Sequence, residues 1–339
     1  MKLQPLVWLV FALMGAAQAQ VAVTPALDSS QVGTAQPSIE QWLLRLHEVS
    51  RQGAYVGTFV LTAGNHMSSA RIWHVCEGTQ QIERVEALSG VRRSIYRRND
   101  QVMTYLPESR VAIAEKRASL GLFPNLLSRA DLSIAQHYRL IAIGRDRVAG
   151  FGADVIQLVP RDRWRFGYRV WTEQTTGMVI KLQTLDDKQT VLEQAAFSDL
   201  QLAQPLSWAK LSAMMDNTEG YVVKRPELIS TSADQQGWHI RGDVPGFKSM
   251  SCHKRQDVGT DVDVGAFQWV FSDGLATVSL FIEAFDATRH MKLQHPDELA
   301  IGATHVLTRR LGDWWLTAVG EVPHQTLQRF AQSLERKSK

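Results

Sequence analysis

The chain has 339 residues and a formal net charge of +3, with 45% hydrophobic and 21% charged residues. This length is more than one hydrophobic core usually serves, so it favours two domains. A charge so close to balance argues against a strongly basic nucleic-acid-binding protein. The composition is otherwise typical of a folded globular chain.

The N-terminus predicts export. Lys2 supplies a positive charge, residues 6–14 (LVWLVFALM) form an apolar run, and residues 17–19 (AQA) have the small-x-small pattern of a signal peptidase site. A membrane-spanning helix needs about 20 apolar residues, so an N-terminal membrane anchor is the weaker alternative. We therefore expect a signal peptide at 1–19, a flexible leader at 20–37, and an exported, soluble protein.

Residues 38–204 show a helical pattern followed by strand patterns. Ser38 and Gln41 have the spacing of a capping box, and the apolar residues after them recur on one helical stripe. Alternating segments bounded by turn residues then predict strands at 55–63, 69–77, 81–88, 91–98, 101–106, 141–143 and 155–159. Two short helical patterns interrupt the strands: one carries Leu126, Leu127 and Ala130, the other Ile134, His137 and Tyr138. The order predicts a large antiparallel sheet covered by helices.

The clearest strand pattern is the segment 166–202. Turn residues at 175–177 and 186–189 divide it into three consecutive antiparallel strands. In the first strand, alternation assigns the side chains to two faces, with Phe166, Tyr168 and Val170 on one and Arg165, Arg169 and Trp171 on the other. Such a meander has an apolar face that another part of the chain must cover.

A second domain is expected after a linker at 205–235, where Pro and Gly interrupt the pattern and a short helix is predicted at the start. The domain at 236–339 shows two strand pairs, which cover 268–272 with 275–283 and 304–309 with 314–322. Its last element is a helix whose apolar face carries Leu327, Phe330, Ala331 and Leu334. We expect a small antiparallel sheet with one packed helix.

The chain lacks the sequence motifs of nucleophilic hydrolases, zinc proteases, P-loops and dinucleotide-binding folds. We therefore predict no catalytic residue, no metal and no cofactor. Three weaker patterns are more typical of polar loops: Cys252-His253, the acidic residues Asp257, Asp261 and Asp263, and the pair His290 and His295. Cys76 and Cys252 are compatible either with a disulfide or with two separate buried thiols.

Two clusters of arginine and aromatic residues are candidates for binding. Arginine beside aromatic rings suits anionic ligands with an apolar part, or an acidic peptide. Solvated strand faces are the alternative explanation for each cluster. The candidate binding residues are Arg92, Arg93, Arg97, Arg98, Arg161, Arg163, Trp164, Arg165, Phe166, Tyr168 and Trp171.

Four segments carry a resemblance that goes beyond these patterns. They are GTFVLTAGNHMSSARIWH, DRWRFGYRVWTEQTTGMVIKLQTLDDKQTVLEQAAFSDL, FSDGLATVSLFIE and RRLGDWWLTAVGEVP. In this order and spacing they resemble the RseB/MucB family of periplasmic stress-response regulators, from about Ile39 to Leu334. The resemblance implies an N-terminal domain similar to lipoprotein carriers, an unclosed antiparallel barrel wrapped over helices around an apolar cavity. It also implies a smaller C-terminal sheet with a packed helix that is important for partner contact.

The resemblance also implies a function. Members of the family bind the periplasmic part of a membrane anti-sigma factor and shield it from regulated proteolysis, until lipopolysaccharide or a mislocalised lipoprotein releases them. A periplasmic lipid or lipoprotein carrier is the main alternative, and an envelope hydrolase is a second one. The sequence leaves open the releasing ligand, the residues that contact the partner, self-association into a homo-oligomer, and movement of the domains across 205–235.

Overall fold

A computed structural model describes residues 38–49, 53–116, 123–124, 131, 133–256, 266–290 and 299–337. These residues belong to one compact unit. The predicted signal peptide and leader lie outside the described residues, as do the helical pattern at Leu126, Leu127 and Ala130, the acidic residues Asp257, Asp261 and Asp263, and His295. Among the described residues, no helix is long and apolar enough to cross a membrane.

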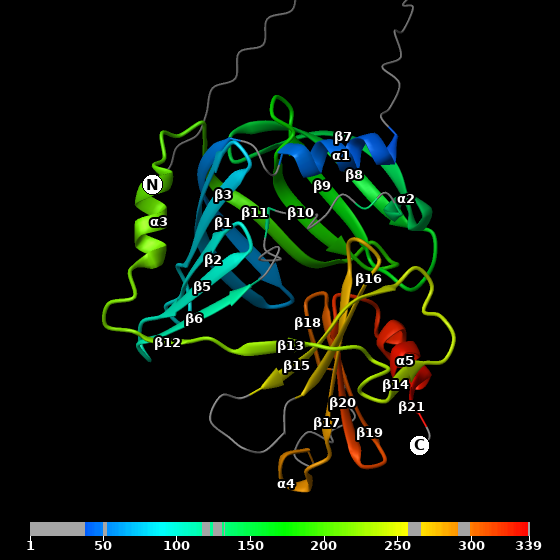
Figure 1. Ribbon diagram of the computed structural model, residues 1–339. Helices are drawn as coiled ribbons and strands as arrows, with labels where there is room; N and C mark the ends of the chain where they lie inside the picture. The colour runs from blue at the N-terminus through cyan, green and yellow to red at the C-terminus, as the bar shows by residue number, and fades with distance from the viewer. Residues whose placement is uncertain are drawn as a thin grey trace, which may run out of the picture. The chain divides into compact units, whose positions relative to one another are not determined.

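The first part of the chain forms a large sheet of twelve strands (Figure 1). In chain order they are β1 (Ala54–Ala63), β2 (His66–Glu77), β3 (Gln80–Ala87), β4 (Ser94–Arg98), β5 (Gln101–Leu106), β6 (Val111–Lys116), β7 (Tyr138–Val148), β8 (Phe151–Pro160), β9 (Gly167–Glu173), β10 (Val179–Leu185), β11 (Val191–Leu202) and β12 (Val222–Lys224). Their order in the sheet is β12-β6-β5-β4-β3-β2-β1-β11-β10-β9-β8-β7. The described strands therefore form an unclosed barrel with β12 and β7 at its edges, which confirms the predicted fold class. The predicted meander corresponds to β9, β10 and β11.

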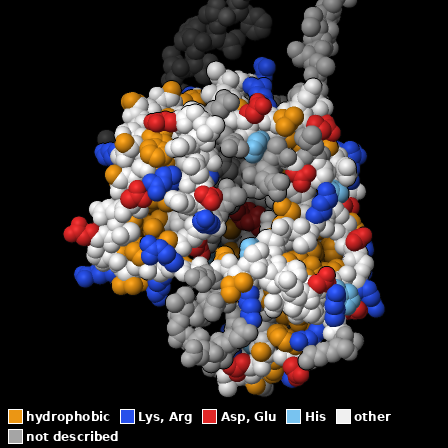
Figure 2. Space-filling model, viewed as in Figure 1, with side chains coloured by type: hydrophobic (Ala, Val, Ile, Leu, Met, Phe, Trp, Pro, Cys, Tyr) orange, Lys and Arg blue, Asp and Glu red, His pale blue; other side chains and the backbone are white. Residues whose placement is uncertain are grey.

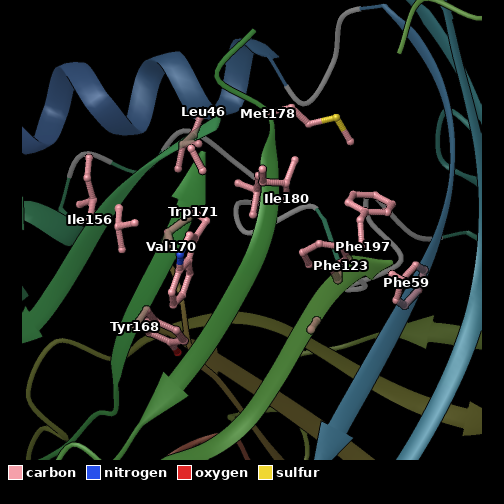
Figure 3. Close-up of a cluster of buried hydrophobic side chains, with 14 of the residues drawn as sticks. Leu46, Phe59, Phe123, Ile156, Tyr168, Val170, Trp171, Met178, Ile180 and Phe197 are labelled. Atoms are coloured by element: carbon pink, nitrogen blue, oxygen red, sulfur yellow. The ribbon is translucent and has the colours of Figure 1, made fainter. Parts of the chain in front are cut away.

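Helix α1 (Ile39–Val49) covers the inner face of this sheet. It begins with the predicted capping box, because the Gln41 amide donates to Ser38 Oγ and the Ser38 amide donates to Gln41 Oε1, each at 3.2 Å. The helix buries Trp42, Leu43 and Leu46. Figure 3 shows Leu46 directed towards the side chains that line the strands below it. A second helix, α2 (Ile134–His137), precedes β7.

Aromatic side chains fill the inside of the unclosed barrel beside α1. The rings of Phe59, Phe123 and Phe197 contact one another, with centroids 4.9–6.3 Å apart (Figure 3). Gly57 makes room for this cluster, because a Cβ at that position would collide with the Phe197 ring. Burial of each such ring is worth about 1.5–3 kcal/mol. The resemblance implied an apolar cavity, and these side chains belong to the apolar core on the inside of the barrel.

Helix α3 (Trp208–Asp216) packs on the outer face of the same sheet. Ser207 caps its N-terminus by accepting a hydrogen bond from the Lys210 amide. Its Leu211 joins a buried cluster with Val75 and Ile82. The helix agrees with the prediction at the start of the linker. The rest of the linker also carries the short strands β12 and β13 (Glu227–Ser230), because each pairs with the edge of a sheet.

The second sheet has seven antiparallel strands in the order β13-β15-β16-β17-β20-β19-β18. Its further strands are β15 (Lys248–Gln256), β16 (Phe267–Ser272), β17 (Thr277–Ala284), β18 (Leu299–Ile301), β19 (Thr304–Leu311) and β20 (Trp314–Gly320). A separate pair joins β14 (Trp238–Ile240) to β21 (Leu334–Arg336). Two helices accompany them, α4 (Ala287–His290) and α5 (His324–Ser333). Helix α5 buries Leu327, Phe330 and Ala331 against this sheet as predicted, while Leu334 packs into the same core from β21.

Candidate partner-binding and ligand-binding site

The basic segment between β8 and β9 is a tight loop. Asp162 closes the loop, because its Oδ1 accepts hydrogen bonds from the Trp164 amide and from Arg165 Nε, both at 2.9 Å. Strand alternation therefore does not place Arg161, Arg163 and Arg165 on one face. Arg161 and Arg163 are exposed, whereas Arg165 is buried.

Arg165 joins the two sheets. Its Nη1 donates to Asp273 Oδ2 at 2.6 Å, and the side chains of both residues are fully buried. Its Nη2 donates to the Pro245 carbonyl at 2.6 Å, and its guanidinium lies over the rings of Tyr138 and Phe247. Asp273 lies in the turn between β16 and β17. Arg165 was predicted to bind an external ligand. Its guanidinium is instead buried and pairs with groups of the protein itself.

Other contacts extend this junction between the sheets. From α5, Gln325 donates to the Arg163 carbonyl at 2.6 Å, and Thr326 donates to the Trp164 carbonyl at 2.8 Å. The ring of Phe166, another predicted site residue, packs beside His305 of β19 at 5.8 Å between centroids. A pocket of about 310 Å³ opens here, lined by Val159, Pro160, Asp162, Arg163, Arg165, Phe166, Gly167, Asp186, Asp187, Gln189, Pro323 and Gln325. Of the predicted residues, the structure thus brings Arg163, Arg165 and Phe166 together.

The turn between β18 and β19 contacts the large sheet at the start of β11. Gly302 adopts a φ of +60°, and a Cβ there would lie 2.7 Å from the Ala63 Cβ and 3.2 Å from Glu193 Oε2. Burial and the charge of Glu321 raise the pKa of Glu193 to about 7, against the lowering effect of a hydrogen bond from the Ala303 backbone. A carboxylate that titrates near neutral pH therefore lies where the two sheets meet.

The predicted cluster around β4 is divided among three environments. Arg92 and Arg93 precede the strand and are exposed. Arg97 is 3% exposed and donates to Glu83 at 2.9 Å, inside the large sheet. Arg98 points to the opposite face and pairs with Asp216 of α3 at 2.7 Å. Adjacent residues of a strand point to opposite faces, so Arg97 and Arg98 do not form one basic surface.

The two remaining aromatic candidates are core residues. Tyr168 is 4% exposed and lies beside Tyr138, with centroids 6.1 Å apart. Trp171 is 5% exposed, donates from Nε1 to Asp146 at 2.8 Å, and carries Lys181 Nζ over its ring at 4.3 Å. Both residues therefore stabilise the fold, as Figure 3 illustrates for their positions among the buried side chains. Neither offers a ring to a ligand at the surface.

Sequence reasoning missed a pocket of about 680 Å³ in the smaller sheet. It combines aromatic rings with hydroxyl groups, and its lining includes Ser230, Thr231, Ser232, Trp238, Phe247, Ser249, Met250, Ser251, Cys252, Trp269, Phe271 and Phe330. The pocket could not be predicted because a loop from the expected linker supplies much of its wall.

The surface charge agrees with the nearly balanced composition. Figure 2 shows basic and acidic side chains mixed with hydrophobic ones over the visible face. Within the described ranges, no group of three or more His, Cys, Asp or Glu residues could hold a metal ion. Cys76 in β2 and Cys252 in β15 are both free thiols, which answers the question that the sequence left open.

Together, the unclosed barrel, the smaller sheet and the pockets between and beside them are the architecture of a two-part binding protein. Comparison with known proteins identifies its class. The MucB/RseB N-terminal domain matches residues 38–215, and the MucB/RseB C-terminal domain matches residues 232–335. The chain belongs to the MucB/RseB family.

Individual relatives support this assignment over nearly the whole chain. The chain is 30% identical to the sigma factor AlgU regulatory protein MucB of Pseudomonas aeruginosa over 95% of both proteins. It is 22% identical to the sigma-E factor regulatory protein RseB of Escherichia coli, over 92% of this chain and 95% of the relative. A crystal structure of MucB in complex with MucA(peri) matches 88% of this chain and 98% of that one, with a TM-score of 0.65 and 28% identity.

Proposed function

We propose that this protein is a periplasmic negative regulator of the envelope stress response. It binds the periplasmic region of a membrane anti-sigma factor and shields that region from regulated proteolysis. One observation carries the proposal: the fold matches, over 88% of the chain, a MucB structure in complex with MucA(peri). The order of the two family domains along the chain agrees with it.

In this proposal the protein acts by binding and not by turnover of its partner. A bound segment is protected because a protease cannot reach backbone that another protein covers. Lipopolysaccharide or a mislocalised lipoprotein would release the partner if this ligand binds the partner-free conformation more tightly than the partner-bound one. The partner would then lose as much binding free energy as the ligand gains between the two conformations. The apolar interior under α1 suits acyl chains, since each buried methylene is worth about 0.8 kcal/mol.

The exposed arginines are the candidates for the charged contacts. Arg92 and Arg93 are exposed before β4, and Arg161 and Arg163 are exposed in the loop at the junction of the sheets. Their guanidinium groups suit carboxylates of an acidic segment or phosphates of a lipid headgroup, with bidentate geometry in either case. These four arginines remain in the proposed site, together with Trp164, whose half-buried ring lies under the Arg163 guanidinium at 4.9 Å.

The experiment is a protease protection assay. The mature protein is mixed with the periplasmic segment of the organism's anti-sigma factor and the first-site protease, and cleavage is followed with and without lipopolysaccharide. We expect slow cleavage with the protein present and recovery of the rate when lipopolysaccharide is added. Cleavage at the unprotected rate by folded protein would refute the regulatory function. If that protein nevertheless retains bound acyl lipid, the lipid carrier becomes the better explanation.

A charge reversal tests the proposed arginines. The double variant Arg92→Glu, Arg93→Glu should weaken binding of the anti-sigma segment by at least about tenfold if both arginines contact carboxylates. Arg225→Glu changes an exposed arginine between β12 and β13 and serves as the matched control. Isothermal titration calorimetry measures both. Equal affinities for the two variants would remove Arg92 and Arg93 from the site without affecting the proposed function.

A further inference from the structure

Three side chains of the large sheet form a hydrogen-bonded row. His74 Nε2 lies 3.1 Å from Cys76 Sγ, and His74 Nδ1 lies 3.0 Å from Glu83 Oε1. His74 and Cys76 are two residues apart in β2 and therefore share a face, while Glu83 is directly opposite His74 in β3. A thiol, an imidazole and a carboxylate in this order form the arrangement that activates cysteine nucleophiles.

The row is fixed by its surroundings. The ring of Tyr55 in β1 stacks on His74 at 4.8 Å between centroids. Arg97 in β4 donates to the second carboxylate oxygen of Glu83 at 2.9 Å. The side chains of His74 and Glu83 are 0% and 1% exposed, so they have little freedom to turn away from Cys76. An ion pair inside the sheet thus holds the imidazole in place.

The thiol at the end of the row has access to a pocket. Cys76 is only partly buried and lines a pocket of about 350 Å³ together with His47 and Glu48 of α1 and Gln80 and Gln81 of β3. The pocket is large compared with a water-sized molecule, whose share of liquid volume is about 30 Å³. A hydroperoxide or a small alkylating reagent therefore fits beside the sulfur.

The protonation of His74 favours reactivity. Burial lowers the pKa of His74, but hydrogen bonds to Cys76 and Glu83 and the charge of Glu83 outweigh this effect and raise it to about 9. The other charged or titratable groups nearby are Arg97, on the far side of Glu83, and His47 and Glu48, which line the pocket. At neutral pH the ring is therefore an imidazolium, and an imidazolium that donates to sulfur stabilises the thiolate.

We propose that Cys76 is a peroxide-reactive thiol, with His74 as its proton donor and Glu83 as the residue that positions His74. This site is separate from the proposed partner-binding function and does not depend on it. Its substrate class is small hydroperoxides. Its product is a reversibly oxidised cysteine on the inside of the unclosed barrel.

The Cys76 thiolate attacks one oxygen of hydrogen peroxide, so that an S–O bond forms and the O–O bond breaks. The sulfur loses two electrons and becomes a sulfenic acid, and the peroxide gains them. The departing hydroxide takes the proton of the His74 imidazolium and leaves as water. His74 remains neutral until it takes a proton from solvent, and a dithiol such as dithiothreitol restores the thiol.

Cys252 supplies an internal control in the same molecule. Cys252 is in β15 and lies opposite Trp269 of β16. Burial raises the pKa of its thiol. Cys252 should therefore react more slowly than a free cysteine, whereas Cys76 should react faster. The variants Cys252→Ser and Cys76→Ser each leave one thiol to be measured alone.

The test measures iodoacetamide alkylation at pH 6 by mass spectrometry, with N-acetylcysteine as reference. Because His74 Nε2 lies 3.1 Å from the sulfur of Cys76, the Cys252→Ser protein should be alkylated at least about tenfold faster than the reference. Under hydrogen peroxide the same protein should form a sulfenic acid that dimedone traps and dithiothreitol reverses. The Cys76→Ser protein should do neither.

A rate for Cys76 equal to or below that of N-acetylcysteine at pH 6 would overturn the proposal. So would an absence of dimedone adduct at Cys76 in folded, peroxide-treated protein. His74→Gln tests the role of the imidazole, and we expect it to abolish the excess alkylation rate at pH 6. Circular dichroism shows whether that variant folds. If it does not, the comparison of the two cysteine variants still decides the question.

Discussion

Two buried arginine–carboxylate clusters in this protein have the same chemistry and different consequences. Arg97 and Glu83 lie on the adjacent strands β4 and β3, 14 residues apart, and their ion pair holds His74. Arg165 and Asp273 are 108 residues apart, and their ion pair connects the large sheet to the smaller one. The first cluster organises one sheet internally, whereas the second fixes the position of one sheet on another.

The difference predicts how each cluster responds to change. A buried ion pair adds little stability compared with a well-packed apolar pair, but removal of one partner leaves an uncompensated charge. At the junction, the loss also removes a link between the two sheets. Within the sheet, the same loss would be shared by several hydrogen bonds around Glu83. The junction should therefore be the more sensitive of the two.

The largest effect is expected for Asp273→Ala. It removes the buried carboxylate from Arg165 and leaves Asp162 as the remaining one, so the loss should approach the about 3–5 kcal/mol typical of a broken buried pair. Urea unfolding should show this loss of stability. If the junction opens first, small-angle scattering should also show a larger radius of gyration before global unfolding. Asp273 further accepts hydrogen bonds from the Leu275 and Ala276 amides, so Asp273→Asn is a gentler second variant. Wild-type stability in both variants would contradict the importance of the junction.

The second prediction concerns the cluster within the sheet. Because the pKa of His74 is raised to about 9 in the folded protein, its contribution is complete below the unfolded value of about 6.5 and is lost as the pH rises through about 9. The free energy of unfolding should therefore fall between pH 6.5 and 9. In His74→Gln this slope should become flatter. Chemical denaturation at several pH values measures it, and parallel slopes for both proteins would refute the assignment.

Glu193 allows the junction to be tested by pH alone. Its pKa is raised to about 7 by burial and by the charge of Glu321. Its contribution to stability is therefore complete below pH 4.5 and lost as the pH rises through about 7. Glu193→Gln should remove this loss and raise the melting temperature at pH 7.5 but not at pH 4.5. Thermal unfolding of both proteins at these two pH values tests it, and an equal difference at both would contradict the prediction.

The sequence was informative where local rules decide the structure. The capping box at Ser38 and the meander of 166–202 both follow from spacing and turn residues, and the structure contains them. The hairpin of 268–272 with 275–283 is also present, but its connection spans residues 273–276 and the second strand begins at Thr277. The site was less predictable, because burial depends on what packs against a strand from elsewhere. Nothing near Arg165 in the sequence indicates Asp273. The alternation of His74 and Cys76 within a predicted strand did place both on one face, and that signal was overlooked.

The smallest effect is expected for Asp216→Ala, which completes the comparison at the protein surface. Arg98 holds Asp216 through two hydrogen bonds of 2.7 and 3.0 Å in a bidentate geometry. However, the two side chains are 24% and 57% exposed, so water can replace the lost partner. Exposed pairs of this kind contribute about 0–1 kcal/mol. Urea unfolding measures the difference in the free energy of unfolding between the variant and the wild type, in low salt and in 1 M salt. High salt should reduce this difference further. A loss as large as that of Asp273→Ala would mean that burial does not distinguish these ion pairs.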